Sequence, residues 1–376
     1  MTRGAFSLVS SFCSKSSLAL LFALVVQGAD TPAVLFARAS AALQSQQYPE
    51  AEAGFRAVLK SEPRNIGALG NLGVVYSKTR RYSQAIEVYK AALKLAPRDK
   101  GLLTDLGLAY VKQEQYTPAL SIFQTLATDP LNLQARQLLA SCQLSLGQYE
   151  SALATLVPLA LAEPQDPGPF YMQGIAFTRL KRTAEAHTAF TTMMTVASPA
   201  HADFLMGKAS YETGDFEQAA KFFTRSLAAD PTFEGAHREL GKALTSLRRD
   251  DQAETELRQA GPDDPEALYF LGALLSRNHQ QEAIALLNSA LAMTPDFWGP
   301  LYYLGRLAVE QRRPSEAVTF LKRAALLKPD ESAIHYQLAK AFQQQGKSAE
   351  AQAAFARVKE LKSRSLQTEM DILAPR

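Results

Sequence analysis

The chain has few of the residues that form disulfides and metal centres. Only two of its 376 residues are cysteine, and five are histidine. Cys13 lies in a segment that we expect to be removed, so Cys142 would have no partner for an intramolecular disulfide. Cys142 lies close to Ala140 in a helical pattern, and we expect it to be a small buried hydrophobe.

The chain also has no marked excess of charge of either sign. Lysine and arginine number 40 against 37 aspartate and glutamate residues. Without the first 28 residues, which hold Arg3, Lys15 and no acid, the balance is 38 to 37. Binding to nucleic acid usually needs a clear basic excess, so we expect no nucleic-acid partner.

The common catalytic and cofactor motifs are missing. The sequence contains no GxGxxG, GxxxxGK[ST], HExxH or CxxC pattern. The adjacent Asp263 and Asp264 lie between prolines, where a polar turn is expected in any case. The histidines occur at unrelated places along the chain, namely His187, His201, His237, His279 and His335. We therefore predict no metal, no cofactor and no enzymatic activity.

The most apolar run is too short to cross a membrane. Leu18–Val26 (LALLFALVV) is well below the roughly 20 apolar residues that a spanning helix needs. It follows Arg3 and Lys15 and is followed by small residues, which is the layout of an export signal. We predict a signal peptide at 1–28, with cleavage after Gly28 and a periplasmic or extracellular mature protein. The alternative is an uncleaved anchor, which would be the only membrane contact.

The sequence after the signal is dominated by an internal repeat. LGVVYSKTRRYSQAIEVYKAALKLAP, which starts at Leu72, is followed about 34 residues later by LGLAYVKQEQYTPALSIFQTLATDP. Small residues recur in register through the chain, as at Gly73, Gly107, Gly174, Gly207, Gly241, Gly272 and Gly305. We count about ten copies between Pro32 and Ser365.

Each copy has the pattern of two amphipathic helices. Leu69, Leu72, Gly73 and Tyr76 recur at three- and four-residue steps, which places them on one face of a first helix. A second apolar set begins at Ala85. Small residues let two backbones approach closely, and the aromatic residues fill the space beside them. We expect Gly147, Gly214 and Gly346 to form turns between the helices, and proline to end the second helix.

These recurring residues resemble the tetratricopeptide repeat, although the consensus tryptophan is absent, Tyr211 is displaced by one place and the turn before Ala283 is one residue short. The resemblance implies an all-α fold, a right-handed α-solenoid of stacked antiparallel helix pairs. We predict a solenoid at 29–365 and a polar C-terminal tail at 366–376. The predicted repeats are 32–65, 66–99, 100–132, 133–166, 167–199, 200–233, 234–264, 265–297, 298–331 and 332–365.

The resemblance also implies that the first helix of each pair lines a concave groove, mainly through two places one turn apart. In chain order these places hold Phe36 and Ser40, Gly70 and Val74, Thr104 and Leu108, Gln137 and Ser141, Tyr171 and Ile175, Phe204 and Lys208, Arg238 and Lys242, Tyr269 and Ala273, Tyr302 and Arg306, and Tyr336 and Lys340. The second half mixes tyrosine with basic residues, which favours a partner carrying acidic groups. The predicted groove residues are Lys208, Arg238, Lys242, Tyr269, Tyr302, Arg306, Tyr336 and Lys340.

These features predict a non-catalytic scaffold that binds an extended or helical segment of another protein during envelope assembly or export. The carboxylate clamp of chaperone-binding members is not reproduced, because Asn71 stands alone, and we expect no binding of that kind. The alternative function is a carbohydrate-binding or polysaccharide-export accessory protein, in which Tyr269, Tyr302 and Tyr336 would stack on an anionic glycan. The same residues are also consistent with ordinary amphipathic cover over neighbouring helices.

Overall fold

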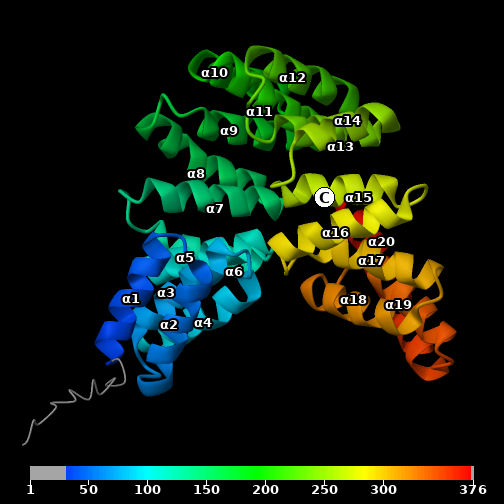
Figure 1. The fold of residues 1–376 in the computed structure, drawn as a ribbon. Coiled ribbons are helices and arrows are strands. Elements are labelled where there is room, and N and C mark those ends of the chain that lie inside the picture. Colours follow the sequence, from blue (N-terminus) through cyan, green and yellow to red (C-terminus); the bar gives the residue numbers. More distant parts are fainter. Residues whose placement is uncertain (1–30, 374–376) are drawn as a thin grey trace, which may run out of the picture.

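The computed structural model is a stack of antiparallel helix pairs (Figure 1). It describes residues 31–373, and of residues 365–373 only the helical backbone. The predicted signal segment lies outside the described residues. All regular secondary structure between 31 and 373 is helical, which confirms the predicted all-α solenoid. None of the helices described is long and apolar enough to cross a membrane.

The first helices of the pairs carry odd numbers and the second helices carry even numbers. The first helices are α1 (Pro32–Gln44), α3 (Ile66–Lys78), α5 (Lys100–Lys112), α7 (Leu133–Ser145), α9 (Pro167–Arg179), α11 (Pro199–Glu212), α13 (Ala236–Ser246), α15 (Pro265–Leu275), α17 (Trp298–Glu310) and α19 (Ser332–Gln344). The second helices are α2 (Tyr48–Ser61), α4 (Tyr82–Leu95), α6 (Tyr116–Leu126), α8 (Tyr149–Ala162), α10 (Thr183–Val196), α12 (Phe216–Ala229), α14 (Asp250–Gln259), α16 (Gln280–Met293), α18 (Pro314–Leu327) and α20 (Ser348–Leu373).

Short polar side chains determine where most of the odd-numbered helices begin. The side-chain oxygens of their N-cap residues accept hydrogen bonds from backbone N–H groups that have no partner within the helix. Asn65 accepts such a bond from Ala68, and Asp99 accepts one from Leu102. Pro32, Pro167, Pro199 and Pro265 add a first residue whose backbone is already set for a helix. The boundaries of these helices therefore follow from local sequence.

The turn within every pair except α15–α16 contains one residue with a left-handed backbone. Gly147, Gly214 and Gly346 take this conformation, as predicted, with φ of 73°, 84° and 72°. Other pairs put a side chain at the same place and adopt a positive φ there all the same. These residues are Gln46, Arg80, Glu114, Lys181, Arg248 and Arg312. Such a residue costs about 1 kcal/mol relative to glycine, so the closed turn outweighs the local strain.

In most pairs, a glycine on the first helix faces a large side chain of the second helix. A Cβ atom on Gly73 would lie 2.3 Å from Cε1 of Tyr89, and one on Gly107 would lie 2.6 Å from Cζ of Phe123. The same pairing recurs along the chain as Gly174 with Phe190, Gly207 with Phe223, Gly241 with Leu257, Gly272 with Leu287 and Gly305 with Leu321. These glycines thus leave room for the large side chains of the facing helix. Cys142 is fully buried, as expected.

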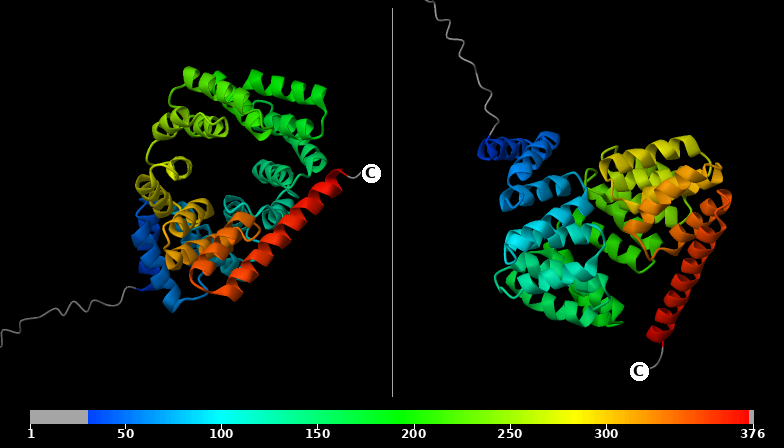
Figure 2. Two further views of the ribbon diagram at one scale, coloured as in Figure 1. Left: turned by 90° about the vertical axis from the view of Figure 1, so that its right-hand side faces the viewer. Right: turned by 90° about the horizontal axis from the view of Figure 1, so that it is seen from below.

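The odd-numbered helices form the inner surface of the stack. Most successive odd-numbered helices touch one another directly, as α7 touches α9 and α15 touches α17. In Figure 1, α10 and α12 lie on the outer side of α9, α11 and α13. The stack curves round so far that its early and late repeats lie side by side, and the helices form a ring (Figure 2). The segment predicted as a tail continues α20 as a helix to Leu373, beyond the ring.

Candidate functional site

The inner surface carries a cavity of about 740 Å³ that crosses three successive repeats. Its wall includes Gln137 and Ser141 of α7, Tyr171 and Ile175 of α9, and Lys208 of α11. All five occupy places that the sequence predicted for the groove. The structure brings them together because equivalent positions of adjacent odd-numbered helices lie next to one another on the concave side. We call this space the groove cavity.

The groove cavity combines an apolar floor with a small number of charged groups. Leu138, Leu144 and Met172 also line it, so an apolar side chain could be buried there. At its edge, the Arg179 guanidinium donates to the backbone oxygen of Glu212 over 2.8 Å. The hydroxyl of Tyr171 donates to the Glu212 carboxylate over 3.4 Å.

The two cations that line this cavity, Arg179 and Lys208, have no carboxylate partner among the described side chains. Lys208 makes no ion pair with the residues whose side chains the structure describes, and the bond from Arg179 goes to a carbonyl oxygen. One carboxylate, that of Glu212, lines the same wall. An acidic group on a bound segment could therefore pair with both cations without displacing an internal partner.

Sequence reasoning missed Arg179 and Glu212. Arg179 follows Ile175 by four residues, and Glu212 follows Lys208 by four. They extend the two predicted groove places by one more helical turn on the same face. The helical period was therefore a usable signal, but the two-place pattern taken from the family stopped one turn short.

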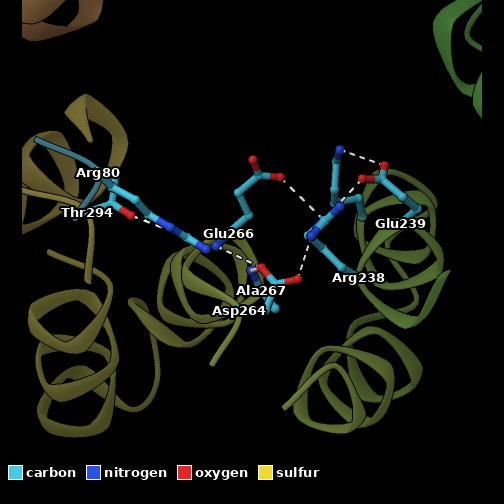
Figure 3. Close-up of polar contacts among 8 residues, drawn as sticks. Arg80, Arg238, Glu239, Asp264, Glu266, Ala267 and Thr294 are labelled. Atoms are coloured by element: carbon cyan, nitrogen blue, oxygen red, sulfur yellow. Dashed lines mark hydrogen bonds and ion pairs between the residues drawn. The ribbon is translucent and has the colours of Figure 1, made fainter. Parts of the chain in front are cut away.

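Further along the inner surface, Arg238 is enclosed by carboxylates (Figure 3). Its guanidinium lies 2.5 Å from Asp264, 3.2 Å from Glu239 and 3.3 Å from Glu266. Burial lowers the pKa of Arg238, but the three carboxylates outweigh that effect and hold it above its usual value. Lys242 lies 2.7 Å from Glu239 and is likewise paired. The charge of these two predicted groove residues is therefore compensated within the protein.

The predicted aromatic residues of α15 and α17 mainly pack on one another. The ring of Tyr269 lies 4.9 Å from Phe297 and 5.8 Å from Tyr303, and burial raises its pKa. Tyr302 is half-buried against Tyr303, and burial raises its pKa as well. Arg306 donates to the hydroxyl of Ser276 over 2.6 Å and covers the ring of Tyr303. Leu301, Leu304, Gly305 and Ala308 of the same helix are buried, as the periodicity predicted.

The last two predicted groove residues lie on α19. Tyr336 is 47% exposed, and the ammonium group of Lys340 lies 5.9 Å from the centre of its ring. Lys340 has no carboxylate partner within the described part of the chain. The eight predicted groove residues thus lie in different surroundings. Lys208 lies in the groove cavity, the exposed Tyr336 and the half-buried Lys340 form a separate pair, and the others are held by neighbours.

A second cavity, of about 780 Å³, lies where the early and late repeats meet. Its wall is formed by turns together with the ends of several helices, and it includes Arg80, Asp263 and Trp298. Arg238 and its partners Asp264 and Glu266 also line it. We call it the junction cavity. No group of three or more histidine, cysteine or acidic side chains able to hold a metal occurs in either cavity or elsewhere in the described residues.

Comparison with known proteins agrees with this architecture. Two sequence profiles, both described as tetratricopeptide repeat, match the chain, one over residues 36–100 and 171–232 and the other over 110–170, 210–277, 274–336 and 308–365. The chain therefore belongs to the tetratricopeptide repeat family, whose members are generally non-catalytic scaffolds for interactions between proteins. No curated protein sequence matches it significantly.

Two solved structures share the fold at low sequence identity. Yeast Tom70 is similar with a TM-score of 0.50 and 14% identity, over 90% of this chain and 94% of that one. The APC/C hetero-tetramer Cut9–Hcn1 is similar with a TM-score of 0.50 and 14% identity, over 88% of this chain and 81% of that one. MamA matches with a TM-score of 0.38 and 22% identity, over 43% of this chain and 97% of that one.

Proposed function

We propose that this chain holds an extended or helical segment of a partner protein in the groove cavity, without changing that segment covalently. The observation that carries the proposal is the wall shared by α7, α9 and α11, where an apolar floor lies beside two cations that lack a carboxylate partner. A segment with apolar side chains next to an aspartate, a glutamate or a terminal carboxylate matches this wall.

Binding would take place at the cell envelope, in an assembly or export process. This part of the proposal rests on the export-signal pattern of residues 1–28. Mass spectrometry of the protein isolated from its own cells tests it, since we expect a mature N-terminus at Ala29. A chain that still begins at the start of the sequence would refute cleavage.

Peptides selected from a random displayed library on the mature protein test the groove. We expect the selected peptides to be enriched in acidic residues. The double variant Arg179→Glu, Lys208→Glu should bind them at least about tenfold more weakly, because two attractive contacts become repulsive. The matched control replaces both Lys60 and Lys94 by glutamate, because these lysines are exposed on the even-numbered helices α2 and α4 and give the same total change of charge away from the cavity. Equal affinity of the double variant and the control would refute the groove assignment.

The glycan alternative receives no support from the packing of the tyrosines. Stacking on a sugar needs one open face of each ring, whereas Tyr269 contacts Phe270, Phe297 and Tyr303. Tyr336 is well exposed, but a single ring does not form a stacking series. We therefore develop only the protein-binding proposal.

A further inference from the structure

Repeats that are far apart in sequence meet at the junction cavity. The guanidinium of Arg80, in the turn between α3 and α4, donates to the hydroxyl of Thr294 over 3.4 Å (Figure 3). The backbone N–H of Ser83 donates to the carboxylate of Asp296 over 2.7 Å. These contacts join residues more than 200 positions apart, so they connect the beginning of the superhelix with a later part of it.

A third contact lies on the neighbouring turn. The ammonium group of Lys328, just after α18, pairs with the carboxylate of Glu114, in the turn between α5 and α6. Glu114 and Arg80 occupy equivalent places in successive repeats, and both have the left-handed backbone of that turn. The same local geometry therefore presents two side chains in register toward the later repeats.

The contact at Asp296 supplies a helix cap that the local sequence lacks. Ser83 is the second residue of α4, and the N-cap residue of that helix, Arg81, makes no side-chain capping bond. The Asp296 carboxylate accepts the free N–H and adds negative charge at the positive end of the helix. Gln113, from the next repeat, donates to the Ser83 hydroxyl over 2.6 Å and steadies the same turn.

The junction is polar and loosely filled. The buried apolar clusters of the described residues keep to one side of it or the other: one extends from Ala39 to Cys142, and another from Leu301 to Ala351. The junction cavity, with its volume of about 780 Å³, lies beside the polar contacts. Separation of the two sides would consequently break hydrogen bonds and an ion pair without exposing a core, and water could replace the lost bonds.

We propose that these three contacts form a salt-sensitive latch that closes the solenoid into a ring, and that the ring opens there to admit a partner to its inner surface. The latch stands on the contacts alone, whereas the admission of a partner rests on the proposed function. A segment with folded domains at both ends cannot thread a closed ring, so it needs a sideways entrance. The junction is the one place in the described chain where only polar contacts between side chains and turns hold distant repeats together.

Single-molecule energy transfer tests the latch without any ligand. Dyes on Lys78→Cys and Leu326→Cys lie at exposed positions on the two sides of the junction. We expect high transfer efficiency at low salt and a second, low-efficiency population at about 1 M salt, where charges are screened within a few ångströms. Lys328→Glu or Glu114→Lys should open the ring at low salt, and the double variant should restore the closed population.

The matched control is Arg249→Glu, which breaks an ion pair of similar exposure with Glu217 between neighbouring repeats. It should leave the distribution of efficiencies unchanged. Circular dichroism and the melting temperature of each variant confirm that a shift reflects opening of a folded chain. Unchanged efficiencies in both single variants, or a double variant that stays open, would overturn the latch.

Admission is tested with a selected acidic peptide, either free or placed between two small folded domains. If the ring gates entry, Lys328→Glu should raise the association rate of the flanked probe about tenfold and leave that of the free peptide unchanged. Equal effects on both probes, or no effect on either, would overturn the gate. If the free peptide does not bind the unaltered protein, the proposed function fails instead, while the transfer result for the latch still holds.

Discussion

Replacement of Arg238 by methionine should destabilise the fold rather than remove a contact with a partner. The side chain of Arg238 is 22% exposed, and it faces Glu239, which is 9% exposed, and Asp264, which is 18% exposed. Methionine keeps much of the apolar volume of the side chain but leaves these carboxylates without their cation. The variant therefore measures what the arginine contributes through charge.

The expected loss of stability follows from the partners that remain. Complete removal of one member of a buried ion pair costs about 3–5 kcal/mol. Glu239 keeps Lys242 at 2.7 Å, and Asp264 keeps two backbone N–H donors at 3.0 Å. Glu266 is 54% exposed and can be hydrated, so it adds little. We therefore expect a loss of about 2 kcal/mol, below the range for a fully orphaned charge.

Hydrogen exchange is the appropriate assay, because repeat arrays unfold in segments and a global midpoint can hide a local loss. Amides of α13 and α15 should exchange about 30-fold faster in Arg238→Met, while those of α3 should be unchanged. Lys208→Met is the matched control, since Lys208 has no carboxylate partner among the side chains that the structure describes, and it should leave exchange unaltered. Exchange in α13 and α15 within twofold of the unaltered protein would refute the assignment of Arg238 to the fold.

Three further predictions concern the packing and charge of single positions. Gly73→Ala should lower stability by about 1–2 kcal/mol in urea unfolding, because the new methyl group meets the buried ring of Tyr89 at a cost that exceeds the gain in helix propensity. The control is Gly101→Ala, in the exposed first turn of α5, which should cause no loss of stability. Arg312→Gly should raise stability by about 0.5–1 kcal/mol, since φ at this exposed turn residue is 54°, and a melting temperature below that of the unaltered protein would contradict this. Burial, together with the nearby charge of Asp99, raises the pKa of the Asp105 carboxyl group. The native state therefore binds a proton at this group more readily than the unfolded chain does. Above the folded-state pKa, the charged carboxylate consequently lowers the stability of the native state. Asp105→Asn should accordingly stabilise the protein at pH 7, and urea titrations repeated toward pH 4 should show the difference shrinking; a difference that grows as the pH falls would reverse the sign.

The fold could be predicted because its determinants are local and repeated. The meeting of Gly73 with Tyr89 is already implied by a small residue and an aromatic residue on facing helical stripes, and the pattern recurs in most copies. The turn before Ala283 is one residue short, and this predicts that the spacing between Gly272 and Leu287 is one residue shorter than the spacing between Gly73 and Tyr89. Gly272 and Leu287 nevertheless pack against each other. Each repeat needs only its neighbours to specify its place.

The candidate site could be predicted only in part, because charge pairing between repeats is not periodic. Lys208 and Arg238 hold similar places on successive inner helices, yet Arg238 alone meets an N-cap aspartate of the next repeat, Asp264. The helical period gives the face on which a side chain lies but not the ion pairs that it makes. The contact of Ser83 with Asp296 could not be predicted from the sequence at all, because it depends on the sum of the small rotations between several successive repeats.

The charge that a partner meets on the inner surface is what remains after internal pairing. Counted from the sequence, the second half of the groove is the basic half. In the structure the carboxylates beside Arg238 and Lys242 neutralise its middle. Among the described side chains, Lys208 and Arg179 in the groove cavity and Lys340 on α19 have no carboxylate partner. An acidic segment should therefore be held first at α9 and α11, across the ring from the junction where it would enter. Different residues would then determine the affinity for the segment and its access to the inner surface, so each could be altered independently.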